Sequence, residues 1–298
     1  MRVVVTGSTS SFAGALLPLL AADSRITQLI GVDRRETSFR HARFTQVLLD
    51  TRSPQLARVL ADTDALIHLA STVCDGTPDE RRGINVIGGQ NVMRCAAQQG
   101  VPRIVHLSSA AVYALPARRH PIDEAHPRGG LPGFGLSEDQ SALETWLDAF
   151  EQEHAGLRLV RLRPHLVVGA HAPALARRLL RAPFTPRFAG AAPRLQCVHA
   201  LDLARAILLA LEHEARGAFN LACADSATLR ELQRAAGGGV LPLPQPLVYR
   251  WLRYRSGAEP TWAEALRHEI VLDTSRARRE LGWKPQYDSV RRCLEASD

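Results

Sequence analysis

The chain has 298 residues, of which 46% are hydrophobic and 22% are charged, the proportions of an ordinary globular enzyme. This length suffices for one large α/β domain or two smaller lobes, and no apolar run approaches the ~18 residues that a membrane span needs. The net charge of +7 comes almost entirely from scattered arginines, so it predicts a solvated surface and no binding of nucleic acid.

The amino-terminal stretch MRVVVTG has the pattern of a short buried strand followed by glycine. It lacks the longer apolar core and small-residue cleavage site of a secretory leader, so we expect a cytoplasmic protein. The five cysteines are widely spaced, and the eleven histidines contain no His-Glu-x-x-His arrangement. We therefore expect no metal site and interpret the cysteines as buried free thiols. They are Cys74, Cys95, Cys197, Cys223 and Cys293.

Short β-branched runs alternate with longer helical patterns along the first half of the chain. This rhythm predicts a doubly wound parallel sheet with helices on both of its faces, an α/β fold. The expected strands are 2–6, 29–33, 44–49, 64–71, 103–109 and 157–163, and the expected helices are 12–22, 56–63, 81–100 and 134–154.

Beyond residue 164 the pattern becomes less regular. Helices are expected at 173–182 and 199–214 and a strand at 217–222, followed by a Gly- and Pro-rich segment at 237–260 and short helices. We predict a larger domain at 1–165, to which 195–222 returns, and a smaller, mixed α/β substrate-binding lobe at 166–298. A ligand would then lie between the two, where the sheet's strands end.

The segment VVVTGSTSSFAGALL, between the first strand and the first helix, has the context of a phosphate-binding turn and predicts a dinucleotide-binding (Rossmann) domain. Gly7 suits the tight turn, and Gly14 suits close packing of the helix on the sheet. The middle glycine of the usual pattern is replaced by Ser10 or Ser11, in a loop that is one residue longer. Asp33, at the end of the second strand, can accept hydrogen bonds from both ribose hydroxyls.

The same region gives a preference between cofactors. The Asp33 carboxylate would repel the 2′-phosphate of NADP, whereas Arg34 and Arg35 would attract it. We expect NAD in preference to NADP.

Family resemblance extends through nearly the whole chain as an ordered set of pieces. The pieces are VVVTGSTSSFAG, GVDRR, LLD at 48–50, DALIHLAS, residues 85–113, RLRPHLVVG at 161–169, CVHALDLARAI at 197–207, GAFNLA and RRELGWKP at 278–285. Together they resemble the extended short-chain dehydrogenases/reductases of the NAD-dependent epimerase/dehydratase type. The ordered set is more specific than any single piece.

This resemblance implies positions for the cofactor and a mode of association. It suggests a homodimer formed through helices 81–100 and 134–154. It implies that the pyrophosphate is lined by Gly7, Ser11, Phe12 and Ala13, and that the adenosine ribose is held by Asp33 with Arg34. The adenine would be approached by Asp50 and Thr51. The length of the cofactor would be followed by Leu69, Ala70 and Ser71, and its nicotinamide would lie near Pro164 and His165.

The resemblance also implies where catalysis would occur. Ser109 matches the family's catalytic serine. The family's tyrosine exchanges a proton with the substrate, and a lysine four residues later holds the nicotinamide ribose and lowers the tyrosine's pKa. Aligned on GLSEDQSALETWL, these positions carry Phe134 and Glu138. The first has no proton to give, the second has the opposite charge, and the chain's only lysine, Lys284, belongs to another motif.

We therefore interpret the chain as a dinucleotide-binding family member without normal redox turnover, acting as a sensor, a scaffold or a partner of another enzyme. The alternative is an active NAD(P)-dependent epimerase, dehydratase or reductase, acting on a sugar nucleotide or another hydroxylated small molecule through a different proton relay. Groups that could serve in such a relay are Ser109, Glu124, His165 and His199. Glu138 itself would either accept hydrogen bonds from the nicotinamide ribose or remain an exposed acid at its helix start.

Overall fold

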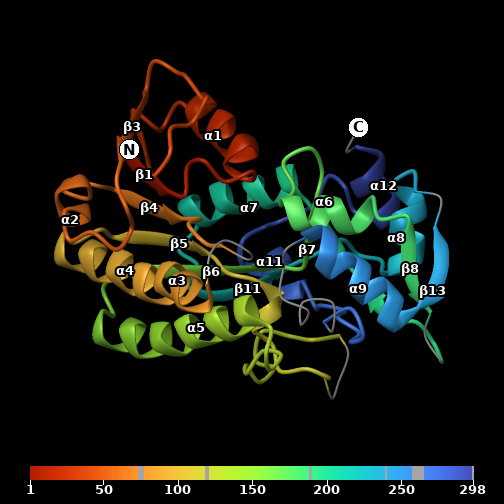
Figure 1. Ribbon diagram of the computed structural model, residues 1–298. Helices are drawn as coiled ribbons and strands as arrows, with labels where there is room; N and C mark the ends of the chain where they lie inside the picture. The colour runs from red at the N-terminus through yellow and green to blue at the C-terminus, as the bar shows by residue number, and fades with distance from the viewer. Residues whose placement is uncertain (73–76, 118–120, 188–189, 239, 257–264, 297–298) are drawn as a thin grey trace.

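A seven-stranded parallel sheet forms the centre of the computed structural model, in the order β11-β6-β5-β4-β1-β2-β3 (Figure 1). The structure describes residues 1–72, 77–117, 121–187, 190–238, 240–256 and 265–296. The chain builds outward from β1 in one direction and then returns to build outward from β4, so the predicted doubly wound fold is confirmed. The strands are β1 (Arg2–Thr6), β2 (Gln28–Asp33), β3 (Phe44–Leu48), β4 (Ala65–His68), β5 (Arg103–Leu107), β6 (Arg158–Pro164) and β11 (Gly217–Leu221).

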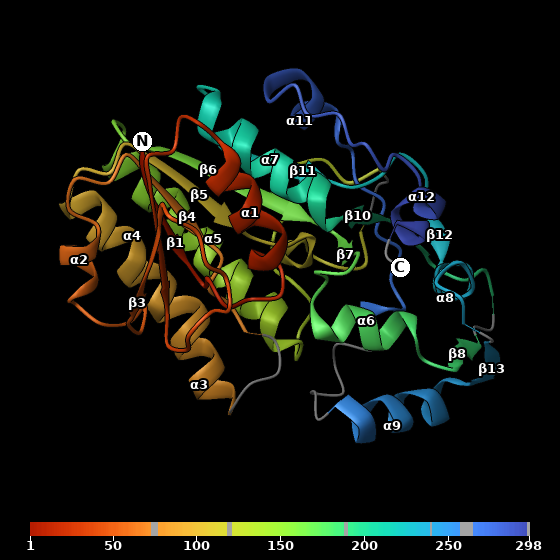
Figure 2. The ribbon, with the colours of Figure 1, turned by 90° about the horizontal axis from the view of Figure 1, so that it is seen from above.

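Alternation of side chains along the strands gives the sheet two apolar faces. In β1, Val3 and Val5 belong to one buried cluster and Val4 to another on the opposite face. Helices α1 (Ala13–Ala22), α7 (Ala200–Glu212) and α11 (Ser275–Glu280) contribute to the first cluster. Helices α2 (Leu56–Val59), α4 (Gly89–Gln98) and α5 (Gly135–Glu153) contribute to the second. Figure 2 shows α1, α7 and α11 together on one side of the sheet.

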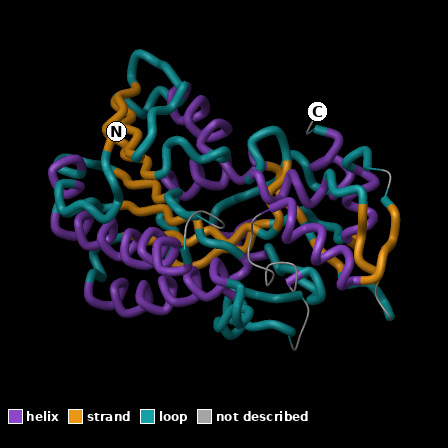
Figure 3. The backbone as a smooth tube through the Cα atoms, in the orientation of Figure 1, coloured by secondary structure: helices purple, strands orange, loops and turns teal. Residues whose placement is uncertain are grey.

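A second group of short elements packs around its own buried cluster beside the sheet (Figure 3). Its core includes Val168, Cys197 and Leu232. The two-stranded pairs are β7 (Leu166–Val168) with β10 (Cys197–His199), β9 (Arg194–Leu195) with β12 (Ala227–Thr228), and β8 (Phe184–Arg187) with β13 (Leu241–Pro244). The helices are α6 (Ala174–Leu180), α8 (Leu229–Ala235), α9 (Gln245–Ser256) and α12 (Val290–Glu295). β11 returns to the edge of the large sheet beside β6, and the exact domain boundaries remain a prediction.

Three helices differ from the sequence prediction. The single helix expected at 81–100 is divided into α3 (Pro78–Arg82), a π-helical segment η1 (Gly83–Gly88) and α4. Packing is close where η1 meets α4, because a Cβ on Gly88 would lie 2.8 Å from Thr51 Oγ1 and one on Gly89 would lie 2.7 Å from Leu143 Cδ2. The helix expected at 56–63 is shortened to α2, and α9 forms inside the segment expected to be irregular. Within the described ranges, no helix is both long and apolar enough to cross a membrane.

Candidate functional site

The turn after β1 approaches the end of β4 so closely that it requires glycine. Gly7 has φ +79°, and a Cβ there would lie 2.6 Å from the main-chain nitrogen of Ala70. Ser10 N donates to Gly7 O at 3.0 Å, and Ala13 N donates to Ser10 Oγ at 3.2 Å. Ser10, one of the two serines in the place of the middle glycine, therefore closes the turn on itself and accepts a hydrogen bond from the first main-chain N–H of α1.

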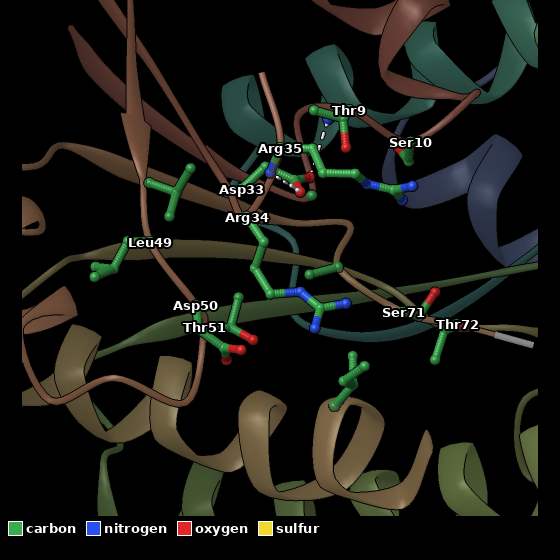
Figure 4. Close-up of a pocket in the computed structure, with 14 residues that line it drawn as sticks. Thr9, Ser10, Asp33, Arg34, Arg35, Leu49, Asp50, Thr51, Ser71 and Thr72 are labelled. Atoms are coloured by element: carbon green, nitrogen blue, oxygen red, sulfur yellow. Dashed lines mark hydrogen bonds between the residues drawn. The ribbon is translucent and has the colours of Figure 1, made fainter. Parts of the chain in front are cut away.

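Asp33 joins this turn to the end of β2. Its Oδ2 accepts a hydrogen bond from Thr9 N at 3.1 Å, and its Oδ1 accepts one from Arg35 N at 3.3 Å (Figure 4). The carboxylate is half-buried and lines a pocket. It is thus held at the carboxyl end of β2, beside the turn after β1, where a ribose diol can reach it.

Asp50, which follows β3, already has a cationic partner. Arg52 donates to it twice, from Nε to Oδ1 at 2.9 Å and from Nη2 to Oδ2 at 2.7 Å. These hydrogen bonds lower the pKa of Asp50, so the carboxylate is ionised at neutral pH. An adenine amino group that bound Asp50 would share this carboxylate with Arg52.

A single pocket collects the ends of β1 to β4 (Figure 4). Arg34 extends its guanidinium from the end of β2 into the space between Thr51 and Ser71. Seven of the predicted cofactor residues line the pocket: Gly7, Asp33, Arg34, Asp50, Thr51, Ala70 and Ser71. Ser10 and Arg35, which the sequence analysis considered for the turn and for the choice between NAD and NADP, also line it, and five further lining residues had no predicted cofactor role: Thr9, Val32, Leu49, Thr72 and Ile84. Their position just before or after a strand's carboxyl end is the signal that would have identified most of them.

The other predicted cofactor residues lie outside this lining. Phe12, Ala13 and Leu69 are buried in the core beneath α1, Pro164 is buried at the end of β6, and Ser11 is exposed. Their contacts with a cofactor, and those of Glu138 and His165, remain predictions.

Phe134 is the residue directly before α5, and the sequence analysis aligned it with the family's tyrosine. Its half-buried ring packs against the cluster that includes Val168 and Cys197. Glu138 is exposed in the first turn of α5, and its Oε1 accepts a hydrogen bond from Gly133 N at 2.8 Å. The structure thus places this acid at a helix start, and the alignment of Phe134 and Glu138 with the family's proton-transfer pair remains a prediction.

Ser109 and Tyr113 follow β5. Ser109 is half-buried, and its Oγ accepts a hydrogen bond from Ala111 N at 3.1 Å. Tyr113 is fully buried, donates to Asn220 Oδ1 at 2.6 Å and accepts from Arg163 Nη1 at 3.0 Å. Burial raises the pKa of Tyr113 to about 12. Tyr113 therefore has a structural position and cannot serve as the missing acid at Phe134.

The other candidate acids differ in how they are engaged. Glu124 Oε1 accepts a hydrogen bond from Asn220 N at 2.8 Å, and burial raises its pKa. His199 Nδ1 accepts one from Leu201 N at 3.2 Å at the start of α7, and burial lowers its pKa. The Nε2 of His165, at the end of β6, is buried without a hydrogen-bond partner, and burial lowers the pKa of His165 to about 4. The Nε2 of His199 is likewise buried without a hydrogen-bond partner.

A buried ionic network that the sequence analysis did not identify fixes β5, β6 and α5 together. Glu144 is fully buried and accepts hydrogen bonds from Ser108 Oγ at 2.5 Å and Arg163 Nε at 2.9 Å. Burial alone would raise the pKa of Glu144, but hydrogen bonding and charge from Arg163, together with the charge of Arg161, lower it. Two of the three arginines in the strand RLVRLRP, Arg161 and Arg163, are buried, and alternating arginines in a strand of this kind are the signal that a buried acid would be needed.

Comparison with known proteins places this geometry in a family. The family model described as NAD dependent epimerase/dehydratase matches residues 3–222. An uncharacterised protein of Mycobacterium tuberculosis is 26% identical over 307 residues, covering 97% of this chain and 81% of that protein. A UDP-glucose 4-epimerase of Rhizobium leguminosarum bv. trifolii is 30% identical over 251 residues, covering 75% and 71% of the two chains.

The crystal structure of Thermus thermophilus UDP-glucose 4-epimerase in complex with NAD shares the fold. It aligns with a TM-score of 0.76 at 21% identity over 99% of this chain and 98% of that chain. The family match covers most of the sheet and the turns that form the pocket. The chain therefore belongs to the NAD-dependent epimerase/dehydratase family.

Proposed function

We propose that this protein binds NAD in the pocket at the ends of β1 to β4 and lacks the normal redox turnover of its family. It would act as a sensor, a scaffold or a partner of another enzyme. The observation that carries this proposal is the occupation of the two proton-transfer positions by the Phe134 ring and the exposed Glu138 carboxylate. Tyr113, the one tyrosine of the Rossmann part, is held inside the core.

The pocket residues suit a dinucleotide. Gly7 lets the turn after β1 lie close against Ala70, where any Cβ would clash, and such a turn before a helix suits a phosphate. The two Asp33 oxygens, which now accept main-chain hydrogen bonds, are the acceptors that a ribose diol requires, and the carboxylate disfavours a 2′-phosphate. The Thermus thermophilus epimerase, whose structure contains NAD, supports the same choice.

Bound NAD would supply a hydride acceptor, and the chain's own groups decide whether it is used. Ser109 offers a hydroxyl that can orient a substrate oxygen. At the start of α5, Phe134 can exclude water but can neither hold nor move a proton. Loss of a general acid–base costs about 10²- to 10⁴-fold in rate, so we expect at most slow conversion.

A second candidate function is a working epimerase that uses another proton relay. The observation that favours it is the buried, unpartnered Nε2 of His165, on a ring that is neutral at pH 7 because its pKa is lowered to about 4. The named function of the Rhizobium leguminosarum relative makes a UDP-sugar the first substrate to test.

We further propose that two copies associate through η1, α4 and α5. Ile87 is an exposed large apolar residue of η1, and Arg94 lies 5.2 Å from the centre of the half-buried Trp146 ring. Analytical ultracentrifugation of the chain and an Ile87→Asp variant tests this: a dimer that dissociates in the variant supports it, and a monomeric parent contradicts it. A cytoplasmic location remains a prediction.

The two functions are separated by measuring binding and turnover independently. NAD, NADH, NADP and NADPH are titrated by fluorescence and thermal shift, and the chain is then assayed with UDP-glucose and UDP-galactose. Binding of NAD without conversion supports the first function. Conversion that is lost in His165→Ala supports the second, and absence of any dinucleotide binding contradicts both.

A further inference from the structure

Three cysteines from separate parts of the chain meet inside the cluster beside the sheet. Cys197 begins β10, Cys223 follows β11, and Cys293 lies in α12. All three are buried, and their sulfur atoms lie within 4.8 Å of one another. The sequence analysis identified them only as buried thiols, because their convergence depends on the tertiary fold.

The sulfur spacing matches that of a bound soft cation. Metal–sulfur bonds of about 2.3 Å would separate three sulfurs in a trigonal arrangement by roughly 4.0 Å. The Sγ atoms of Cys197 and Cys223 are 3.9 Å apart. An ion could therefore be accommodated with little movement of these two side chains.

The surrounding hydrogen bonds direct the thiols favourably. Cys223 Sγ donates to the carbonyl oxygen of Asp225 at 3.4 Å, and Cys293 Sγ donates to that of Tyr287 at 3.2 Å. With these protons directed toward carbonyls, sulfur lone pairs remain for the centre of the group.

We propose that Cys197, Cys223 and Cys293 form a three-thiolate site for one soft, closed-shell cation of the Zn²⁺, Cd²⁺ and Cu⁺ class. Thiolate ligands select this class over harder cations such as Mg²⁺ and Ca²⁺. Within the described residues, these three cysteines form the group of His, Cys, Asp or Glu side chains that is close enough to share an ion.

Such an ion would have a structural role apart from the dinucleotide pocket. It would join β10 and the exit of β11 to the carboxy-terminal helix α12. Apolar neighbours of the cluster, including Leu179 and Leu232, exclude water from it. The binding free energy of the ion would add to the stability of this part of the fold.

The test uses the full chain in a Cys74→Ser background, because Cys74 lies outside the described residues. The reduced, chelator-treated protein is titrated with Cd²⁺ without oxygen, and the thiolate-to-cadmium charge-transfer absorption, proton release and melting temperature are recorded. We expect saturation at one Cd²⁺ per chain, a raised melting temperature, and displacement by Cu⁺.

Single variants Cys197→Ser, Cys223→Ser and Cys293→Ser should each weaken Cd²⁺ binding by more than about 10- to 100-fold. This is the loss seen when only a residue that hydrogen-bonds to a metal ligand is replaced, and here the ligand itself is removed. Each should also reduce the charge-transfer absorption by about a third, because one of the three thiolate ligands is removed. Cys95→Ser, at a buried cysteine of α4, is the matched control and should change neither.

X-ray absorption of the cadmium-loaded parent provides a readout that does not depend on the folding of any variant. Three sulfur neighbours at cadmium support the site. Binding without a charge-transfer band, a band of full strength in Cys223→Ser, or a coordination shell of oxygen and nitrogen would overturn it.

Discussion

Arg163 Nη1 donates a 3.0 Å hydrogen bond to the Tyr113 hydroxyl, which itself donates a 2.6 Å hydrogen bond to Asn220 Oδ1. Tyr113 thereby connects β6 and β11 from within the core. A fully buried phenol whose pKa is raised to about 12 holds its proton at neutral pH. This tyrosine is a structural residue, and under the proposed alignment Phe134 stands at the position of the family's tyrosine.

Replacement of Tyr113 by Phe should therefore affect stability and leave dinucleotide binding unchanged. Removal of the hydroxyl deprives Asn220 and Arg163 of a partner inside the core, at a cost of about 1–3 kcal/mol. Urea unfolding measures the loss, and Tyr254→Phe, at a residue 88% exposed, is the control. A Tyr113→Phe variant of normal stability that loses NAD binding would show that the hydroxyl serves the ligand.

Restoring the family pair should create turnover. In the double variant Phe134→Tyr with Glu138→Lys, a phenol and an ammonium return to the start of α5, and we expect UDP-sugar conversion to rise by about 10²- to 10⁴-fold. Stopped-flow detection of NADH measures this rise. Phe134→Tyr alone should gain less, because no cation lowers the pKa of the new phenol. Equal rates in the parent and the double variant would show that other features of the cleft prevent conversion.

Asp33→Asn should weaken NAD binding and reduce discrimination against NADP. Loss of charge-assisted hydrogen bonds of about 1.5–3 kcal/mol corresponds to roughly 10- to 100-fold in affinity for NAD. Fluorescence titration with NADH and NADPH measures both changes. Asp64→Asn is the control, because Asp64 accepts from Arg2 N at the opposite end of the sheet. Unchanged NADH affinity in Asp33→Asn would remove this carboxylate from the cofactor site.

Glu144→Gln should destabilise the fold strongly. Removal of this charge leaves Arg163, 2% exposed, without its anionic partner in the core, which costs about 3–5 kcal/mol. The midpoint of urea unfolding should fall accordingly. Glu295→Gln breaks an exposed ion pair with Arg291 in α12 and should leave the midpoint unchanged. Equal midpoints for the two variants would contradict the buried network.

Two stacked histidines predict acid sensitivity. The rings of His68 and His106 lie 5.3 Å apart in the core, and burial lowers the pKa of both, that of His106 to about 4. In the unfolded chain a histidine titrates near about pH 6.5, so below this pH the unfolded state binds protons that the folded state does not. Stability should be full above about pH 6.5 and fall toward about pH 4, by about 1.4 kcal/mol per pH unit for each histidine.

Unfolding free energies between about pH 7 and about pH 5 check this slope. His106→Leu should reduce the slope by the contribution of one proton, whereas His213→Leu, at an exposed ring, should leave it unchanged. If the slope in His106→Leu equals that of the parent, the contribution assigned to His106 comes from other groups.

The sequence was sufficient to predict the sheet and much of the pocket. Gly7, Asp33 and Asp50 each follow a short β-branched run, and the carboxyl ends of parallel strands meet at one edge. The structure brings all three into one pocket, although their roles toward a cofactor remain predictions. The family assignment rested on the order of many pieces, and the match over residues 3–222 confirms it.

What the sequence could not predict depends on contacts between distant residues. The convergence of Cys197, Cys223 and Cys293 has no local pattern, because the three occupy different elements. The burial of Glu144 in an amphipathic helix is visible only once Arg163 is placed opposite it. The π-helical segment η1 ends where Gly88 and Gly89 closely approach neighbouring segments, and such contacts are not encoded in local propensity.

The most direct test of the central claim is a single-turnover experiment on the unmodified chain loaded with NAD. It is mixed with UDP-glucose, and both nicotinamide absorbance and formation of UDP-galactose are followed. With Phe134 and Glu138 in place, we expect bound NAD to remain oxidised and the sugar to remain unconverted over many minutes. Rapid appearance of NADH or of UDP-galactose would contradict the account.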